Sequence, residues 1–177
     1  MYFAGFITSA FVLGSIVLQD YKYRAVSWVL FPLAAISLIF LTLSYLKPFN
    51  LTDYFSGIAI NCGFVTLQLL FIKLYFSLKS GTIKKIINTK IGLGDILMFY
   101  TITVCFSPIY FIFFYIISLS LSVLIIILTK LISANTYIEK NVPLAGFMAL
   151  FLLIFMLINV YLKLNPLDDL RIIKFLT

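Results

Sequence analysis

Long runs of apolar residues, separated by short polar clusters, occupy most of the chain. A helix needs about 20 residues to cross the roughly 30 Å hydrocarbon layer of a bilayer. Runs close to that length, with charges gathered at their ends, predict an all-α fold: a polytopic membrane helix bundle with about six transmembrane helices. We assign residues 1–177 to a single membrane-embedded domain, with expected spans at 2–18, 26–45, 54–76, 91–106, 109–129 and 144–162.

Composition agrees with this pattern, since 63% of the residues are hydrophobic and 11% are charged, whereas a soluble domain is roughly 45–50% apolar. The lipid bilayer is therefore the expected environment. A net charge of +7 would suggest nucleic acid as a partner of a soluble protein. Here the basic residues lie in short clusters between apolar runs, a pattern that sets membrane orientation, so we expect no nucleic-acid partner.

The basic residues also predict the orientation. With both termini outside, the inner loops hold nine of the 13 Lys and Arg residues and the outer segments hold four, as the positive-inside rule favours. In this topology Asp20, at the end of the first span, and Asp95, at the start of the fourth, reach the same cytoplasmic side. They lie 75 positions apart in the sequence, yet they can meet in space.

The chain has no histidine and two cysteines. This excludes zinc sites built on histidine motifs or paired Cys-x-x-Cys, and it excludes Ser-His and Cys-His catalytic pairs, so we expect no metal and no cofactor. Cys62 and Cys105 lie inside long apolar runs, where a thiol usually behaves as a small hydrophobe. Catalysis by carboxylates therefore remains as the candidate chemistry, and a catalytic Ser-Lys pair that uses Lys73 is the alternative.

Asp95 is the most unusual acidic residue, because its neighbours from Ile91 to Phe99 are apolar or glycine. An ionisable group inside a membrane segment costs about 2.5–3.5 kcal/mol and usually has a function. The alternative is a carboxylate that caps the start of the fourth span. Gly92 and Gly94 would let a substrate peptide approach closely. The remaining acids are expected to be solvated, apart from Asp20: Asp53, Glu139, Asp168 and Asp169.

Asp20 precedes Arg24 by four positions, so both would project from one face if the helix continues. The pair could be an exposed ion pair worth a few tenths of a kcal/mol. Alternatively, Asp20 is a boundary carboxylate within reach of water and of Asp95. Two close carboxylates tend to share a proton, so one can act as a base towards water while the other donates to a carbonyl oxygen. This chemistry is peptide hydrolysis without metal, histidine or covalent intermediate.

Three pieces of the sequence, taken together, resemble the type IV prepilin peptidase family of Gly-x-Gly-Asp membrane aspartyl proteases. They are Asp20-x-x-x-Arg24-x-Val26-Ser27, then Gly92-x-Gly94-Asp95, then Val142-Pro143-Leu144-Ala145-Gly146-Phe147. The resemblance implies that Asp20 and Asp95 are catalytic, with Gly92, Gly94 and Arg24 as motif or substrate-binding residues. It also implies a bacterial cytoplasmic (inner) membrane location and cleavage of the leader from pilin-like precursors at the cytoplasmic face.

The chain departs from the family at two places. It lacks the insert with a four-cysteine cluster found in the larger bifunctional members, so it resembles the short, peptidase-only members. Leu97 stands where many members have Lys. Two alternatives stay open: an inactive scaffold that binds pilin-like helices, and a small transporter or channel that uses the two carboxylates as a proton or cation site.

Polar residues within the spans are interpreted as packing features. Gly57, Asn61, Phe64 and Gln68 share one face of the third span, and Asn159 lies in the sixth. Such polar side chains usually hydrogen-bond across helices, at about 0.6 kcal/mol each. The basic segment 79–90 is expected to lie against anionic headgroups.

Overall fold

The computed structural model describes residues 2–44, 50–80, 92–132, 144–162 and 166–167. In these residues the chain forms helices and no strand, which confirms the all-α prediction. The helices, in chain order, are α1 (Tyr2–Tyr23), α2 (Leu30–Leu43), α3 (Leu51–Ser80), α4 (Leu93–Ile102), α5 (Pro108–Ile132) and α6 (Leu144–Leu162).

Four of the helices, α1, α3, α5 and α6, are long and apolar enough to cross a bilayer. The chain is therefore a helical membrane protein. The bounds of α6 match the expected span, whereas α1 and α3 continue beyond the expected 2–18 and 54–76. Hydropathy marks a span end at the first charged residues, but helical hydrogen bonding continues through them.

Helices α2 and α4 are shorter than the sequence predicts. They have 14 and 10 residues, or about 21 and 15 Å, against a hydrocarbon layer of roughly 30 Å. The expected spans 26–45 and 91–106 are therefore not continuous helices. In α2 the cause lies at the start, because residues 24–29 form the turn that follows α1.

A buried, non-helical connection, residues 103–107, joins α4 to α5. Asn61 of α3 donates from Nδ2 to the carbonyls of Thr103, at 3.1 Å, and Phe106, at 2.8 Å. The Tyr54 hydroxyl donates to the carbonyl of Val104 at 2.9 Å. Backbone groups at membrane depth must find partners within the protein. The side chains of α3 thus let α4 end early, and the hydrogen-bonding role expected for Asn61 is confirmed.

We expect Asn61→Leu to destabilise the protein by about 2–5 kcal/mol, because two buried carbonyls lose their donor. The measurement is unfolding in mixed micelles with increasing denaturing detergent. Ser56→Ala is the matched control, since the exposed Ser56 hydroxyl bonds only the Asp53 carbonyl of its own helix. Equal stability of the two variants would refute this account of the α4–α5 connection.

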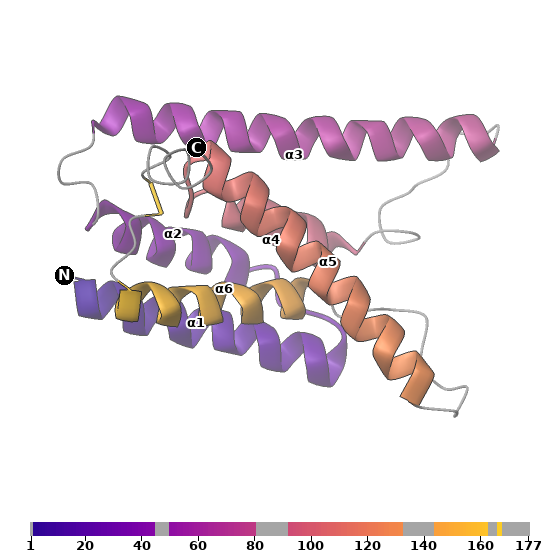
Figure 1. The fold of residues 1–177 in the computed structure, drawn as a ribbon, viewed down its shortest axis with the longest axis horizontal. Helices are drawn as coiled ribbons and strands as arrows, with labels where there is room; N and C mark the ends of the chain where they lie inside the picture. The colour runs from indigo at the N-terminus through magenta and orange to yellow at the C-terminus, as the bar shows by residue number, and fades with distance from the viewer. Residues whose placement is uncertain (1, 45–49, 81–91, 133–143, 163–165, 168–177) are drawn as a thin grey trace.

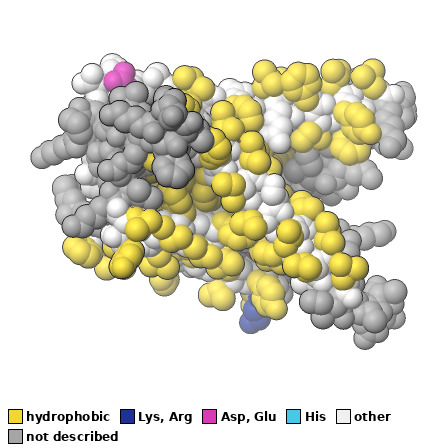
Figure 2. Space-filling model, in the orientation of Figure 1, with side chains coloured by type: hydrophobic (Ala, Val, Ile, Leu, Met, Phe, Trp, Pro, Cys, Tyr) yellow, Lys and Arg dark blue, Asp and Glu magenta, His cyan; other side chains and the backbone are white. Residues whose placement is uncertain are grey.

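The packing of the helices brings three helix termini to one end of the bundle (Figure 1). Helix α6 lies along α1, α1 packs on α2, and α4 contacts both α2 and α6. Leu13 and Ile16 of α1 and Met148 of α6 are fully buried in the hydrophobic core. Figure 2 shows hydrophobic side chains over α3, α5 and α6, as a lipid-facing surface requires. The end of α1 and the starts of α4 and α6 lie at one end of the bundle.

Candidate active site

Two carboxylates converge on the first turn of α6. The amide of Gly146 donates to Oδ2 of Asp20, and the amide of Ala145 donates to Oδ1 of Asp95 at 2.9 Å. These amides belong to the first turn of a helix, whose N–H groups have no partner within the helix and carry its positive dipole end. Since the two donors are consecutive residues, the structure brings Asp20 and Asp95 together, as the topology predicts.

Asp20 lies in the last turn of α1 and is only 7% exposed, so it is not part of a solvated surface ion pair. Helix α1 ends at Tyr23 and does not continue through Arg24, which adopts a left-handed conformation with φ 50°. The Arg24 amide donates to the Asp20 carbonyl at 3.0 Å, a hydrogen bond typical of a left-handed helix end. Arg24 is exposed, and its positive charge interacts electrostatically with the Asp20 carboxylate.

Asp95 is half-buried in the first turn of α4, where the helix dipole favours a carboxylate. Gly92 precedes the helix with an extended backbone, φ −66° and ψ 141°. The side chain of Asp95 reaches across to α6, so it does more than cap its own helix. Its charge and that of Asp20 interact electrostatically, as expected from their hydrogen bonds to neighbouring amides.

Two glycines make room for these carboxylates. A Cβ atom on Gly146 would lie 3.0 Å from both Cβ and Oδ2 of Asp20, and one on Gly92 would lie 3.0 Å from Oδ2 of Asp95. Gly94 differs, because its Cβ would meet only Phe31 Cζ, at 3.6 Å, which is an ordinary contact. The close approach of the two Asp side chains, and not backbone conformation, therefore explains why positions 146 and 92 are glycine.

Sequence reasoning missed two supports of the site. The donors on α6 are backbone amides of Ala145 and Gly146, which have no side-chain signature. Gln19 accepts a hydrogen bond from the Ser27 amide at 3.0 Å and so closes the turn after α1, next to Asp20. Gly146, in the segment that opens the sixth span, is the one sequence signal that points to these amide donors.

The other predicted residues take no part in the hydrogen bonds to the two carboxylates, or they lie outside the described part of the chain. Asp53 and Lys73 are exposed on α3, and Leu97 is partly buried against the hydrophobic core. Cys62 and Cys105 are free thiols. Outside the described residues lie Glu139, Val142, Pro143, Asp168, Asp169 and most of the basic segment 79–90.

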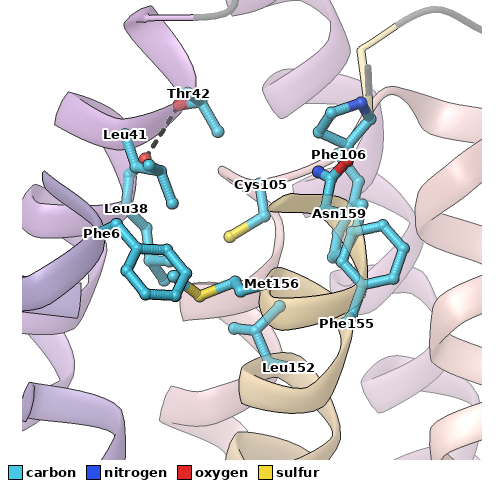
Figure 3. A pocket seen from close by; sticks show the side chains of 11 residues that line it. Phe6, Leu38, Leu41, Thr42, Cys105, Phe106, Leu152, Phe155, Met156 and Asn159 are labelled. Atoms are coloured by element: carbon cyan, nitrogen blue, oxygen red, sulfur yellow. Dashed lines mark hydrogen bonds between the residues drawn. The ribbon is translucent and has the colours of Figure 1, made fainter. Parts of the chain in front are cut away.

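A small cavity of about 20 Å³ lies elsewhere in the bundle, about two to four turns further along α6 (Figure 3). Its lining is mostly apolar and includes Cys105, Leu152 and Met156. Asn159 also lines it, and its Oδ1 is buried without a hydrogen-bond partner in the described residues. The interhelical hydrogen bond expected for Asn159 therefore does not form through its Oδ1 within the described residues, and this cavity is separate from Asp20 and Asp95.

Within the described residues, no group of three or more Cys, Asp or Glu side chains is placed to hold a metal ion. Comparison with family models, with curated proteins and with solved structures finds no match to this chain. The fold and the site define a helical membrane protein with two carboxylates bound to one helix terminus.

Proposed function

We propose that this protein is a membrane aspartyl endopeptidase that cleaves the leader peptide of type IV pilin-like precursors at the cytoplasmic face of the bacterial inner membrane. The observation that carries the proposal is the hydrogen bonding of Asp20 and Asp95 to consecutive amides of α6. Paired carboxylates with a shared proton are the arrangement that aspartic proteases use for peptide hydrolysis.

The α6 amides engage Oδ2 of Asp20 and Oδ1 of Asp95. In the proposed mechanism the opposite oxygens contact water and substrate. The ionised carboxylate takes a proton from water as the water oxygen bonds to the scissile carbonyl carbon, and the protonated carboxyl donates to the carbonyl oxygen. The peptide C–N bond then breaks as the amide nitrogen receives the proton taken from water, and a hydroxyl of the tetrahedral intermediate returns its proton to the other carboxylate. The fixed amides keep both carboxyl groups in position throughout.

The substrate would lie extended beside the start of α4, because a peptide bond within a helix is sterically hard to attack. Gly92 is exposed and extended there, and Arg24 is exposed near Asp20. We assign these two residues and Gly94 to the substrate path. The apolar segment of the precursor would stay in the bilayer, and the reaction needs no cofactor.

The test uses the purified protein in liposomes with a single-span precursor that carries a short basic leader. The proposal predicts two products whose masses place the cut just ahead of the hydrophobic segment. Co-purification of the intact precursor without cutting would identify a scaffold instead. Proton or cation flux that depends on Asp95, with no cleavage, would identify a transporter.

The two motif glycines should differ in their tolerance of a methyl group. Gly92→Ala should lower the cleavage rate by about tenfold or more, because its Cβ would meet Asp95 Oδ2 at 3.0 Å and shift the carboxylate. Gly94→Ala should have a smaller effect, since its Cβ makes only an ordinary contact with Phe31. Initial rates on one precursor compare them, and greater loss in Gly94→Ala would contradict the assigned geometry.

A further inference from the structure

Exposed aromatic and basic side chains gather where α1 ends and the chain turns towards α2. We call Tyr21, Lys22, Tyr23, Arg24 and Trp28 the basic corner. Its three aromatic residues are 80%, 65% and 67% exposed in chain order, and both cations are exposed. Lys22 Nζ lies 5.1 Å from the centroid of the Tyr23 ring. Tyrosine and tryptophan concentrate at the level of the lipid headgroups, which places the basic corner at the membrane surface.

The outer face of α1 leads from the basic corner into the bilayer. Phe11 and Leu18 are 76% and 71% exposed, and helical spacing puts them on the same face as Lys22. From Phe11 to Lys22 the helix rises about 16 Å, close to half of the roughly 30 Å hydrocarbon layer. A lipid acyl chain on this face would therefore extend from near the bilayer centre to a headgroup at the cations.

We propose that the basic corner binds the phosphate of an anionic phospholipid in the leaflet on the side of Asp20 and Asp95. Lys22 and Arg24 supply the positive charge that attracts the phosphate. The acyl chains lie over Phe11 and Leu18. Lys and Arg side chains near the membrane surface are attracted to anionic headgroups.

The lipid site adjoins the carboxylates through Arg24. Its amide donates to the Asp20 carbonyl at 3.0 Å, and its charge acts on the Asp20 side chain. A bound headgroup therefore fixes the end of the helix that carries Asp20 and sets its depth below the membrane surface. Lipid binding itself does not depend on the proposed peptidase activity, so the two proposals can fail separately.

Trp28 is the only tryptophan of the chain, so its fluorescence reports on the basic corner directly. The test places the protein in phosphatidylcholine vesicles that contain a minor fraction of brominated lipid, either phosphatidylglycerol or phosphatidylcholine. We expect several-fold stronger quenching of Trp28 by the brominated phosphatidylglycerol, because the cations enrich the anionic lipid there. Equal quenching by the two brominated lipids would overturn the proposal.

Variants locate the effect. Lys22→Gln combined with Arg24→Gln should abolish the preference for phosphatidylglycerol, and Lys22→Gln alone, on the helix surface, should reduce it if the double variant does not fold. Lys73→Gln is the matched control, since Lys73 is an exposed cation of α3. A preference that survives both corner variants would refute the site. Loss of the preference on adding soluble glycerol phosphate would also refute it, because the site would then bind soluble phosphate and not lipid.

Discussion

Replacing either Asp20 or Asp95 with Asn should reduce precursor cleavage by about 10²- to 10⁴-fold, the range typical of a lost general acid or base. The side-chain oxygen of Asn can still accept the hydrogen bond from Gly146 or Ala145, so the fold should remain intact. What the amide lacks is the ability to take a proton from water or to hold one for the carbonyl oxygen. Initial cleavage rates in liposomes, with matched protein amounts, measure the loss.

Asp53→Asn provides the control for these two variants. Asp53 is an exposed carboxylate in the first turn of α3, remote from the α6 amides, so its replacement removes the same charge without touching the site. Its cleavage rate should equal that of the unaltered protein. If Asp20→Asn or Asp95→Asn cleaves at that same rate, the two-carboxylate mechanism is wrong.

The second large effect is expected at Gly146, which has no functional group of its own. Gly146→Val adds atoms where even a single Cβ would lie 3.0 Å from Asp20 Cβ and Oδ2. Asp20 must then move away from the α6 amide or α6 must move away from α1. Misplacement of a catalytic group by about 1 Å can cost 10²-fold in rate, and we expect a loss of at least that size. Cleavage rate and helix content by circular dichroism are measured together.

Gly63→Ala is the matched control, because Gly63 is also a helical glycine and its Cβ would meet nothing within 4 Å. The control should keep full activity, with stability unchanged or raised by about 0.5–1 kcal/mol, since alanine favours the helix more than glycine. Full activity in Gly146→Val would mean that the close approach of α1 to α6 does not position Asp20.

The sequence predicts those features of the fold that follow from the lengths of apolar runs and the positions of charged residues. Span 144–162 agrees with α6 at both ends, where the apolar run follows Pro143 and stops before Lys163 in the sequence. The predicted end of α1 is too early, because the charge of Asp20 marks the expected edge of the membrane although the helix continues to Tyr23. Helix α1 ends because one residue, Arg24, adopts a left-handed conformation, and hydropathy contains no information about backbone dihedrals.

Hydropathy also does not predict the early end of α4. Residues 103–106 are as apolar as those before them in the predicted span, yet the helix stops at Ile102. It can stop there because Asn61 and Tyr54, more than 40 positions away, satisfy the freed carbonyls. Such a long-range hydrogen bond becomes visible only once α3 and α4 are packed together.

For the site, topology alone predicts that Asp20 and Asp95 share one end of the bundle. It does not predict what holds them, because a backbone amide donor is present at nearly every residue of every helix. The amides of Ala145 and Gly146 are distinguished only by their place in the first turn of α6 and by its contact with α1. Gly146 is the residue in the sequence that permits that contact.

The measurement that tests the central claim most directly is cross-linking of positions 20 and 95 in the membrane. Asp20→Cys and Asp95→Cys are combined in a chain whose Cys62 and Cys105 are replaced by Ser, and a short bifunctional thiol reagent is added. The account predicts rapid formation of one peptide pair joined between positions 20 and 95, detected by mass spectrometry. The pair Asp53→Cys with Asp95→Cys should not be joined. Failure of the 20–95 pair to react, with both thiols accessible to a monofunctional reagent, would contradict the account.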